Sequence, residues 1–187
     1  MEVVEAIKDI KQINSMKRYL KKNSERDHLL FVLGINTGLT ITEILDIRVK
    51  DLVNGEVVKD FYTLKKEDNK EEKKIYLNQK VKKSILYYVQ TTCLTPENYL
   101  FHSKKTDNHL SRQQAYRIIH QAAEAIGLDA KIGTHSMRKT FGYHAYKRGV
   151  AVSLLQKHFN HSTKQETYKF LGITKEECTT PRIDVNL

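Results

Sequence analysis

Apolar residues at helical spacing open the chain. In residues 9–22 an apolar side chain recurs every three or four positions, at Ile10, Ile13, Met16 and Leu20, and this spacing predicts an amphipathic helix. Ser24 and Asp27 have the spacing of an N-cap residue and its accompanying carboxylate, which predicts that a second helix begins there. Residues 29–35 are apolar on nearly every face, so we expect that helix to be buried and Gly38 to end it.

A short helix and a hairpin are predicted next. Thr40 is a typical N-cap residue, and the helix after it carries Glu43. Residues 61–64 and 74–77 form two short strand-like runs. The highly charged residues 65–73 between them indicate an exposed hairpin turn, or alternatively a loop that touches DNA.

The rest of the pattern is helical. It predicts helices over residues 79–90, 111–126, 135–148, 152–158 and 162–171, which glycines separate. About eight helices against two or three strands indicate an α+β fold that is predominantly α-helical, with one small antiparallel β-sheet. A chain of 187 residues is long enough for one domain with a real core and short for two. We therefore expect a single domain over residues 1–187.

The charge of the chain points to a partner. The formal net charge is +10, and an excess of this size usually means a polyanionic partner. Nucleic acid is the first candidate and an anionic membrane surface the second, while a solvated lysine-rich surface needs no partner at all. No apolar run approaches the roughly 20 residues that span a bilayer, and residues 1–5 lack the features of a signal peptide. We expect a cytoplasmic protein that does not engage a membrane.

The two cysteines do not suggest a metal site. Cys93 and Cys178 lie far apart and neither has a CxxC partner. We expect two reduced thiols in a reducing compartment, without a disulfide framework or a bound metal.

His135 and Arg138 are the first residues that could carry chemistry. They lie three positions apart at the start of a predicted helix, and this spacing puts both on one face. The helix N-terminus adds free N–H groups and a partial positive charge. An arginine fork, an imidazole and a helix N-terminus together suit a phosphate. The pair alone is a weak motif, and the alternative is two surface polar residues.

His161 is a second candidate phosphate ligand. It precedes a predicted helix that Ser162 or a neighbouring threonine caps. The alternative is that His161 simply caps this helix.

Taken together, these residues resemble the catalytic domain of a tyrosine recombinase of the phage-integrase family. Residues 34–45 (GINTGLTITEIL) are similar to the first family box, usually TGLRxxEL. The charged hairpin resembles the family's β2–β3 turn, and residues 134–140 (THSMRKT) resemble the HxLR box. Residues 155–162 (LQKHFNHS) with residues 167–173 resemble the LGHS…Y box. The resemblance covers about residues 6–175, which we expect to be the domain core, with a tail over residues 174–187.

The resemblance implies a specific chemistry. In the family, a tyrosine attacks a DNA phosphate and forms a 3′-phosphotyrosine link. Two arginines and the histidines hold the nonbridging oxygens as charge builds up. A lysine on the hairpin turn protonates the leaving oxygen. The family needs no metal and no cofactor, and we expect none here.

Three of the family's catalytic positions depart from this pattern. The first-box arginine is replaced by Thr40, and Arg48, two turns further on, is a poor substitute. Nine residues after His161, where the family has its nucleophile, stands Phe170. Tyr168 is close, but two helical positions turn it about 200° around the axis, away from the phosphate.

The turn lysine is the third departure. A gap-free placement of the hairpin puts Asp68 where the family has lysine, with Lys66 and Lys70 on either side as possible substitutes. Glu43, His135, Arg138 and His161 match the family pattern. Glu43 helps to orient the family site, although it could equally be a surface or capping carboxylate.

These departures leave the chain's enzymatic status open. The first hypothesis is a degenerate integrase that binds double-stranded DNA, without cutting it, as a regulator, a decoy or a partner in a recombinase homo- or hetero-oligomer. The second is an active recombinase that uses Tyr168 or a tyrosine supplied in trans. The third is a scaffold whose charge only aids solubility. The residues before Asp9 are too few for the family's usual N-terminal DNA-binding domain, so we expect weak and mostly non-specific binding by the domain alone.

Overall fold

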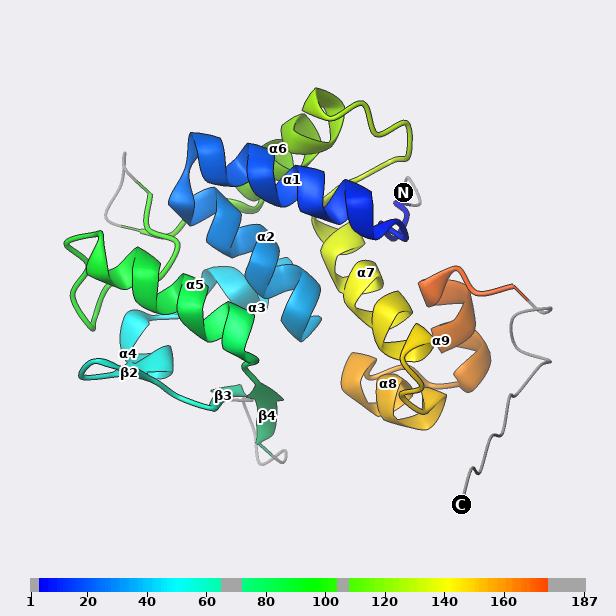
Figure 1. Cartoon of the computed structure of the whole chain (residues 1–187). Coiled ribbons are helices and arrows are strands. Elements are labelled where there is room, and N and C mark those ends of the chain that lie inside the picture. The colour runs from blue at the N-terminus through cyan, green and yellow to red at the C-terminus, as the bar shows by residue number, and fades with distance from the viewer. Residues whose placement is uncertain (1–3, 65–71, 104–107, 175–187) are drawn as a thin grey trace, which may run out of the picture.

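The computed structural model describes residues 4–64, 72–103 and 108–174, and these residues form nine helices and four strands (Figure 1). The helices are α1 (Ile10–Asn23), α2 (Glu25–Thr37), α3 (Ile41–Leu45), α4 (Val49–Leu52), α5 (Gln79–Gln90), α6 (Arg112–Ala125), α7 (Thr134–Lys147), α8 (Val152–Phe159) and α9 (Lys164–Leu171). The strands are β1 (Val53–Asn54), β2 (Val57–Val58), β3 (Phe61–Leu64) and β4 (Lys73–Tyr76). The predominantly helical prediction is confirmed.

The first two helices begin and end as the sequence predicted. The Asp9 carboxylate accepts a hydrogen bond from the Lys11 N–H at 2.7 Å and caps α1. The Ser24 hydroxyl accepts one from the Asp27 N–H and caps α2. Gly38 ends α2 in the left-handed region at φ 66°, where a residue without a Cβ is least strained.

Helix α2 forms the centre of the main core. It packs against α1, α5 and α7 (Figure 1), and its segment from Leu29 to Gly34 is buried. The approach of α7 is close at Gly34, because a Cβ there would lie 2.6 Å from the Met137 sulfur. A glycine on α2 therefore lets α7 lie directly against it, and this contact fixes where the start of α7 points.

A second, smaller core joins α7, α8 and α9. Leu155 and Phe159 of α8 pack with Leu171 and Ile173 at the end of α9. These three helices lie together on one side of the molecule in Figure 1. The two cores meet along α7, so residues near its start lie between them.

Four details differ from the sequence prediction. The described residues contain two separate two-stranded antiparallel sheets, β1–β2 and β3–β4, instead of one. The four-residue helix α4, which precedes β1, was not predicted, because it is too short to show a helical period in the sequence. Strand β4 starts at Lys73, paired with Leu64, one residue earlier than expected. Helix α9 begins at Lys164 with Thr163 as its cap, so the prediction of a start at Ser162 was wrong.

None of the described helices is long and apolar enough to cross a membrane.

Candidate phosphate site

Thr40 and Glu43 form a closed capping box at the start of α3. The Thr40 hydroxyl accepts a hydrogen bond from the Glu43 N–H at 3.2 Å. The Glu43 carboxylate in turn accepts from the Thr40 N–H at 2.7 Å and from the Thr40 hydroxyl at 2.9 Å. Thr40, which the resemblance aligns with the family's first-box arginine, therefore caps the start of α3 and holds the Glu43 carboxylate in one orientation.

Arg138 connects the three elements that surround the site. Its guanidinium donates to the Gly38 carbonyl at 2.6 Å and to the Phe159 carbonyl at 3.1 Å, and it lies 4.7 Å above the Phe159 ring. Burial lowers the pKa of Arg138, and the charge of Glu43 opposes that shift. Among the described residues, no carboxylate lies within ion-pair distance of Arg138. The group keeps its charge, and N–H groups beyond these two bonds remain for an anion.

His161 lies near Arg138, and both side chains contact the Phe159 ring. Its Nδ1 atom is 3.0 Å from the Thr167 hydroxyl, and burial, followed by the charge of Arg138, lowers its pKa while Glu166 raises it. Because Thr163 caps α9, the alternative interpretation of His161 as that helix's cap is wrong. The Thr167 hydroxyl donates to the Thr163 carbonyl at 3.2 Å, so Nδ1–H of His161 donates to Thr167 and Nε2 of the neutral ring is an acceptor. Nε2 donates to an anion once the ring is protonated.

Phe170 and Tyr168 lie on different sides of α9. The Phe170 ring is 5.0 Å from the His161 ring and 5.1 Å from the Phe159 ring. Tyr168 instead meets Tyr146 edge to face at 5.9 Å. The residue nine positions after His161 is thus the one beside the imidazole, and the neighbouring tyrosine packs against the far part of α7.

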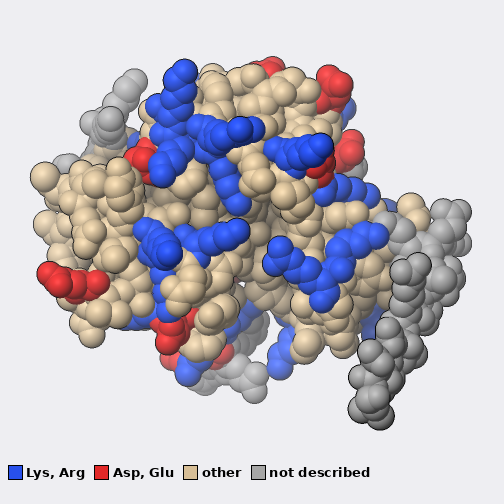
Figure 2. All heavy atoms as spheres, viewed as in Figure 1, with Lys and Arg blue, Asp and Glu red and all other residues tan. Residues whose placement is uncertain are grey.

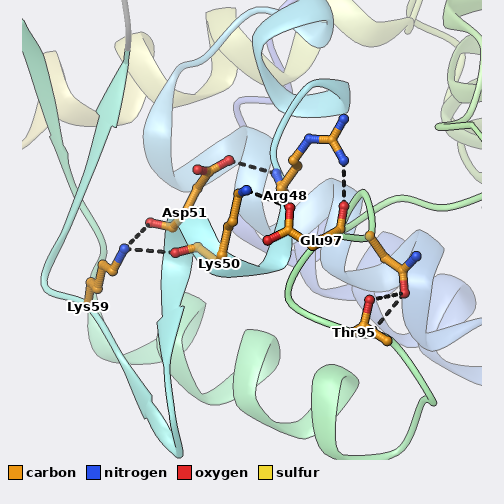
Figure 3. Close-up of polar contacts among 7 residues, drawn as sticks. Arg48, Lys50, Asp51, Lys59, Thr95 and Glu97 are labelled. Atoms are coloured by element: carbon orange, nitrogen blue, oxygen red, sulfur yellow. Dashed lines mark hydrogen bonds and ion pairs between the residues drawn. The ribbon is translucent and has the colours of Figure 1, made fainter.

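The remaining candidates are less well placed. His135 is exposed in the first turn of α7. Arg48 is held elsewhere, since it donates to the Glu97 carbonyl (Figure 3) and stacks 4.2 Å above the Tyr99 ring. It therefore does not replace the arginine missing at Thr40. Lys66, Asp68 and Lys70 lie outside the described residues.

Two residues that the sequence analysis missed border the site. The Lys73 ammonium donates to the backbone carbonyl of His158 and so ties β4 to the end of α8. The Nε2 atom of His158 is buried without a hydrogen-bond partner among the described residues. Burial, and then the charges of Lys73 and Arg138, lower the pKa of His158 to about 4. The only sequence signal for His158 was its position three residues before His161.

The assembled groups can hold an anion and can donate hydrogen bonds to it. Arg138 supplies a fixed charge and His161 an imidazole, and both lie against the Phe159 ring. Among the described residues, no cluster of three or more histidine, cysteine or acidic side chains could bind a metal ion. On the His161 side of α9 the described site contains the Thr167 hydroxyl, which is bonded to the His161 ring, and the phenyl ring of Phe170.

Comparison with known sequences identifies clear relatives. The family model described as "Phage integrase family" matches residues 6–177. A Bacillus subtilis (strain 168) protein named "Probable integrase/recombinase YoeC" is 39% identical over 176 residues, covering 94% of this chain and 93% of that protein. A "Tyrosine recombinase" of Pseudothermotoga lettingae is 25% identical, covering 89% of this chain but 56% of that protein. The chain spans nearly all of the Bacillus protein and about half of the Pseudothermotoga protein.

Solved structures show the same fold. A "Crystal structure of XerA recombinase" aligns with a TM-score of 0.74 at 15% identity, covering 95% of this chain and 61% of the other. The Tn1549 transposon integrase in complex with circular intermediate DNA aligns with a TM-score of 0.71 at 18% identity, covering 95% and 66%. The predicted tyrosine-recombinase catalytic fold is therefore confirmed.

Proposed function

Because the chain belongs to the phage integrase family, we propose that it binds the backbone of double-stranded DNA through Arg138, His135 and His161 and does not cleave the strand by itself. The family carries out site-specific DNA recombination, and the proposal concerns which part of that activity this chain keeps. Binding of the phosphate and attack on the phosphate use different residues, so one can persist without the other.

The observation that carries the proposal is the placement of Phe170. Its ring lies against the His161 imidazole, in the position that the family pattern gives to the nucleophile. A phenyl ring has no hydroxyl, so the covalent phosphotyrosine step has no attacking atom there. Lys139, 5.5 Å above the Phe170 ring, is in contact with a hydrocarbon face in place of a phenolic oxygen.

The capping box at Thr40 supports the same conclusion. The threonine hydroxyl is bonded to Glu43, and a short neutral side chain cannot provide a bidentate charged donor. Losing one such donor to the transition state typically costs on the order of 10² to 10³ in rate. Together with a missing nucleophile, this loss leaves little or no cleavage.

Phosphate binding is favoured by the state of Arg138. The guanidinium is positioned by two carbonyls that do not neutralise it, and Glu43 acts on it only at a distance. The net charge of +10 supplies a long-range attraction to a polyanion. The structural relatives include recombinases described as bound to DNA, one of them as a tetramer on a Holliday junction. By analogy, DNA and further recombinase subunits are the proposed partners.

The alternative function is an active recombinase. Tyr168 would serve it only if the last turn of α9 rotated, because its ring now packs on Tyr146. A tyrosine from another subunit would have to displace Phe170 from His161. We favour the non-cleaving function because both routes need a rearrangement of the smaller core.

A nicked suicide substrate tests the proposal. The duplex carries a family-type core site with a nick that lets the short leaving strand diffuse away, so that even slow cleavage accumulates a covalent adduct. We expect no adduct on a denaturing gel, and duplex binding that weakens as salt rises. A covalent band that Tyr168→Phe removes would overturn the proposal in favour of the alternative. Duplex binding that is insensitive to salt would overturn the phosphate contact itself.

A further inference from the structure

A groove of about 620 Å³ lies between α1, the end of α2, β4, the start of α5 and α7. Its two buried lining residues are Ile13 and Thr140, and the half-buried Ile35 and Phe141 add apolar surface. None of Thr40, Glu43, His135, Arg138 and His161 lines it. The groove is therefore a feature separate from the phosphate site.

The charges that line this groove are all of one sign. Lys17, Lys80 and Arg148 line it, and no aspartate or glutamate does. Within the described parts of the chain, none of these three cations forms an ion pair. Figure 2 shows Lys and Arg side chains gathered over α1, the start of α5 and α7 on this face, with the acidic side chains mostly toward its edges.

Lys17 and Lys80 lie close enough to repel each other. Burial lowers the pKa of the half-buried Lys17, and the charge of Lys80 lowers it further. Two cations that are near each other, with one partly removed from water, favour an anion between them. The groove therefore favours the binding of a negatively charged group, and no described side chain supplies one.

Flat, exposed aromatic surface lies next to these cations. Tyr76 lines the groove and is 57% exposed, and its ring is 5.6 Å from that of Phe61, which is 49% exposed. The amides of Asn14 and Gln79 also line the groove and are exposed. Aromatic faces for stacking, amides for base edges and lysines for phosphates form the combination that single-stranded nucleic acids use.

We propose that this groove is a binding site for single-stranded DNA, in which Tyr76 stacks on a base while Lys17 and Lys80 bind the neighbouring phosphates. The exposed ring of Tyr76 argues for a single strand over a duplex, because a duplex keeps its base faces stacked inside, where a tyrosine cannot stack on them. An acidic protein segment would satisfy the lysines but would leave the exposed tyrosine and the amides without a matching partner. The site extends the proposed function and does not depend on it.

Fluorescence anisotropy with a labelled oligo(dT) of about 20 nucleotides tests the site in the full chain. We expect Lys17→Gln/Lys80→Gln to weaken binding at least about 10-fold, and Tyr76→Ser to weaken it about 5-fold or more. The matched controls are Lys11→Gln/Lys83→Gln, which removes the same charge from the same two helices outside the groove, and Tyr87→Ser, an equally exposed tyrosine on α5. Both controls should stay within about 2-fold of the unaltered chain.

Three outcomes would overturn the site. The first is an equal loss of affinity in the groove variants and their controls. The second is that the Lys17 and Tyr76 substitutions weaken the binding of a duplex of the same charge as much as they weaken the binding of oligo(dT). The third is that poly-glutamate displaces labelled oligo(dT) as well as unlabelled oligo(dT) does, when both competitors are compared at the same concentration of charge. That result would point to an acidic protein segment as the ligand.

Arg138→Ala separates this site from the proposed function. That variant should lose duplex affinity and keep oligo(dT) affinity, so failure of one proposal leaves the other standing. Thermal melting of each variant checks that a loss of binding does not come from unfolding.

Discussion

The ring of Phe170 lies 5.0 Å from the ring of His161, and the proposed function rests on this contact, because it assigns Phe170 to the position of the family's nucleophile. The pair packs on Phe159, whose backbone carbonyl receives a hydrogen bond from Arg138. An apolar side chain at the end of α9 therefore stabilises the same imidazole that the phosphate site uses.

Restoring the missing chemical groups should restore a covalent step. Phe170→Tyr places a hydroxyl beside His161, and Thr40→Arg returns a charged donor at the start of α3. We expect the double variant to form an adduct with a nicked suicide substrate, and Phe170→Tyr alone to form it on the order of 10² times more slowly. Denaturing gel analysis over time measures both rates.

The same experiment contains its control. Phe170→Tyr combined with Tyr168→Phe should behave like Phe170→Tyr, because Tyr168 packs on Tyr146. Thr40→Arg removes the cap of α3, which typically costs about 0.5–2 kcal/mol, so melting must show that the double variant is folded. A folded double variant without any adduct would contradict our placement of Phe170.

Arg138 should contribute to duplex binding through the paired N–H donors of its guanidinium and not only through its charge. Arg138→Ala removes charged hydrogen bonds to phosphate, so we expect an affinity loss on the order of 10-fold or more and a salt slope smaller by about 0.9. Arg138→Lys should restore the slope but only part of the affinity. Binding titrations at several salt concentrations measure both quantities.

Arg48 supplies the matched control for Arg138. It carries the same charge but is held by the Glu97 carbonyl and the Tyr99 ring (Figure 3). Arg48→Ala should change the duplex affinity far less than Arg138→Ala. Equal losses would mean that the chain reads duplex DNA through its net charge alone.

His158 should make the fold sensitive to acid. Its pKa is lowered from 6.5 to about 4, so the unfolded chain binds a proton in the window where the folded chain does not. The stabilisation is complete above pH 6.5 and is lost as the pH falls toward 4, by an amount on the order of 3 kcal/mol at most.

A non-titrating residue tests this pH dependence. His158→Leu should flatten the fall in the free energy of unfolding between pH 6.5 and 4, measured by urea denaturation. Because other groups also titrate below pH 5, the comparison is the difference in slope between the two proteins. An unchanged slope would show that the buried imidazole is protonated without cost.

The contact between α2 and α7 should be intolerant of a methyl group at Gly34. Its Cβ would lie 2.6 Å from the Met137 sulfur and 3.0 Å from the Met137 Cβ, so Gly34→Ala should lower the free energy of unfolding by about 1–3 kcal/mol. Gly34→Ala should cost less in a Met137→Ala background than in the unaltered chain, because the clashing side chain beyond Cβ is then absent, although Met137→Ala itself empties a buried position. Chemical denaturation of the single and double variants gives the comparison.

Local signals in the sequence were sufficient for most of the helices. The caps at Ser24 and Thr40 and the terminating Gly38 were predicted, because capping depends on hydrogen bonds within a few residues. The family boxes also singled out Arg138, His161 and Phe170 by spacing alone, and the structure places all three against the Phe159 ring. The short helix α4 and the second two-stranded sheet were not predicted, since elements of two to four residues show no period.

The sequence by itself determined the phage integrase family and proposed which side chains form the site, with Thr40 and Phe170 aligned to a family arginine and tyrosine. Only the tertiary structure decided what these residues do. The hydrogen bonds of Arg138 to Gly38 and Phe159 cross 100 and 21 residues, and the bond from Lys73 to His158 crosses 85. Contacts over such separations depend on how α2, α7 and α8 pack. This packing is controlled by side-chain volume at positions such as Gly34 and Met137, and no local sequence pattern records it.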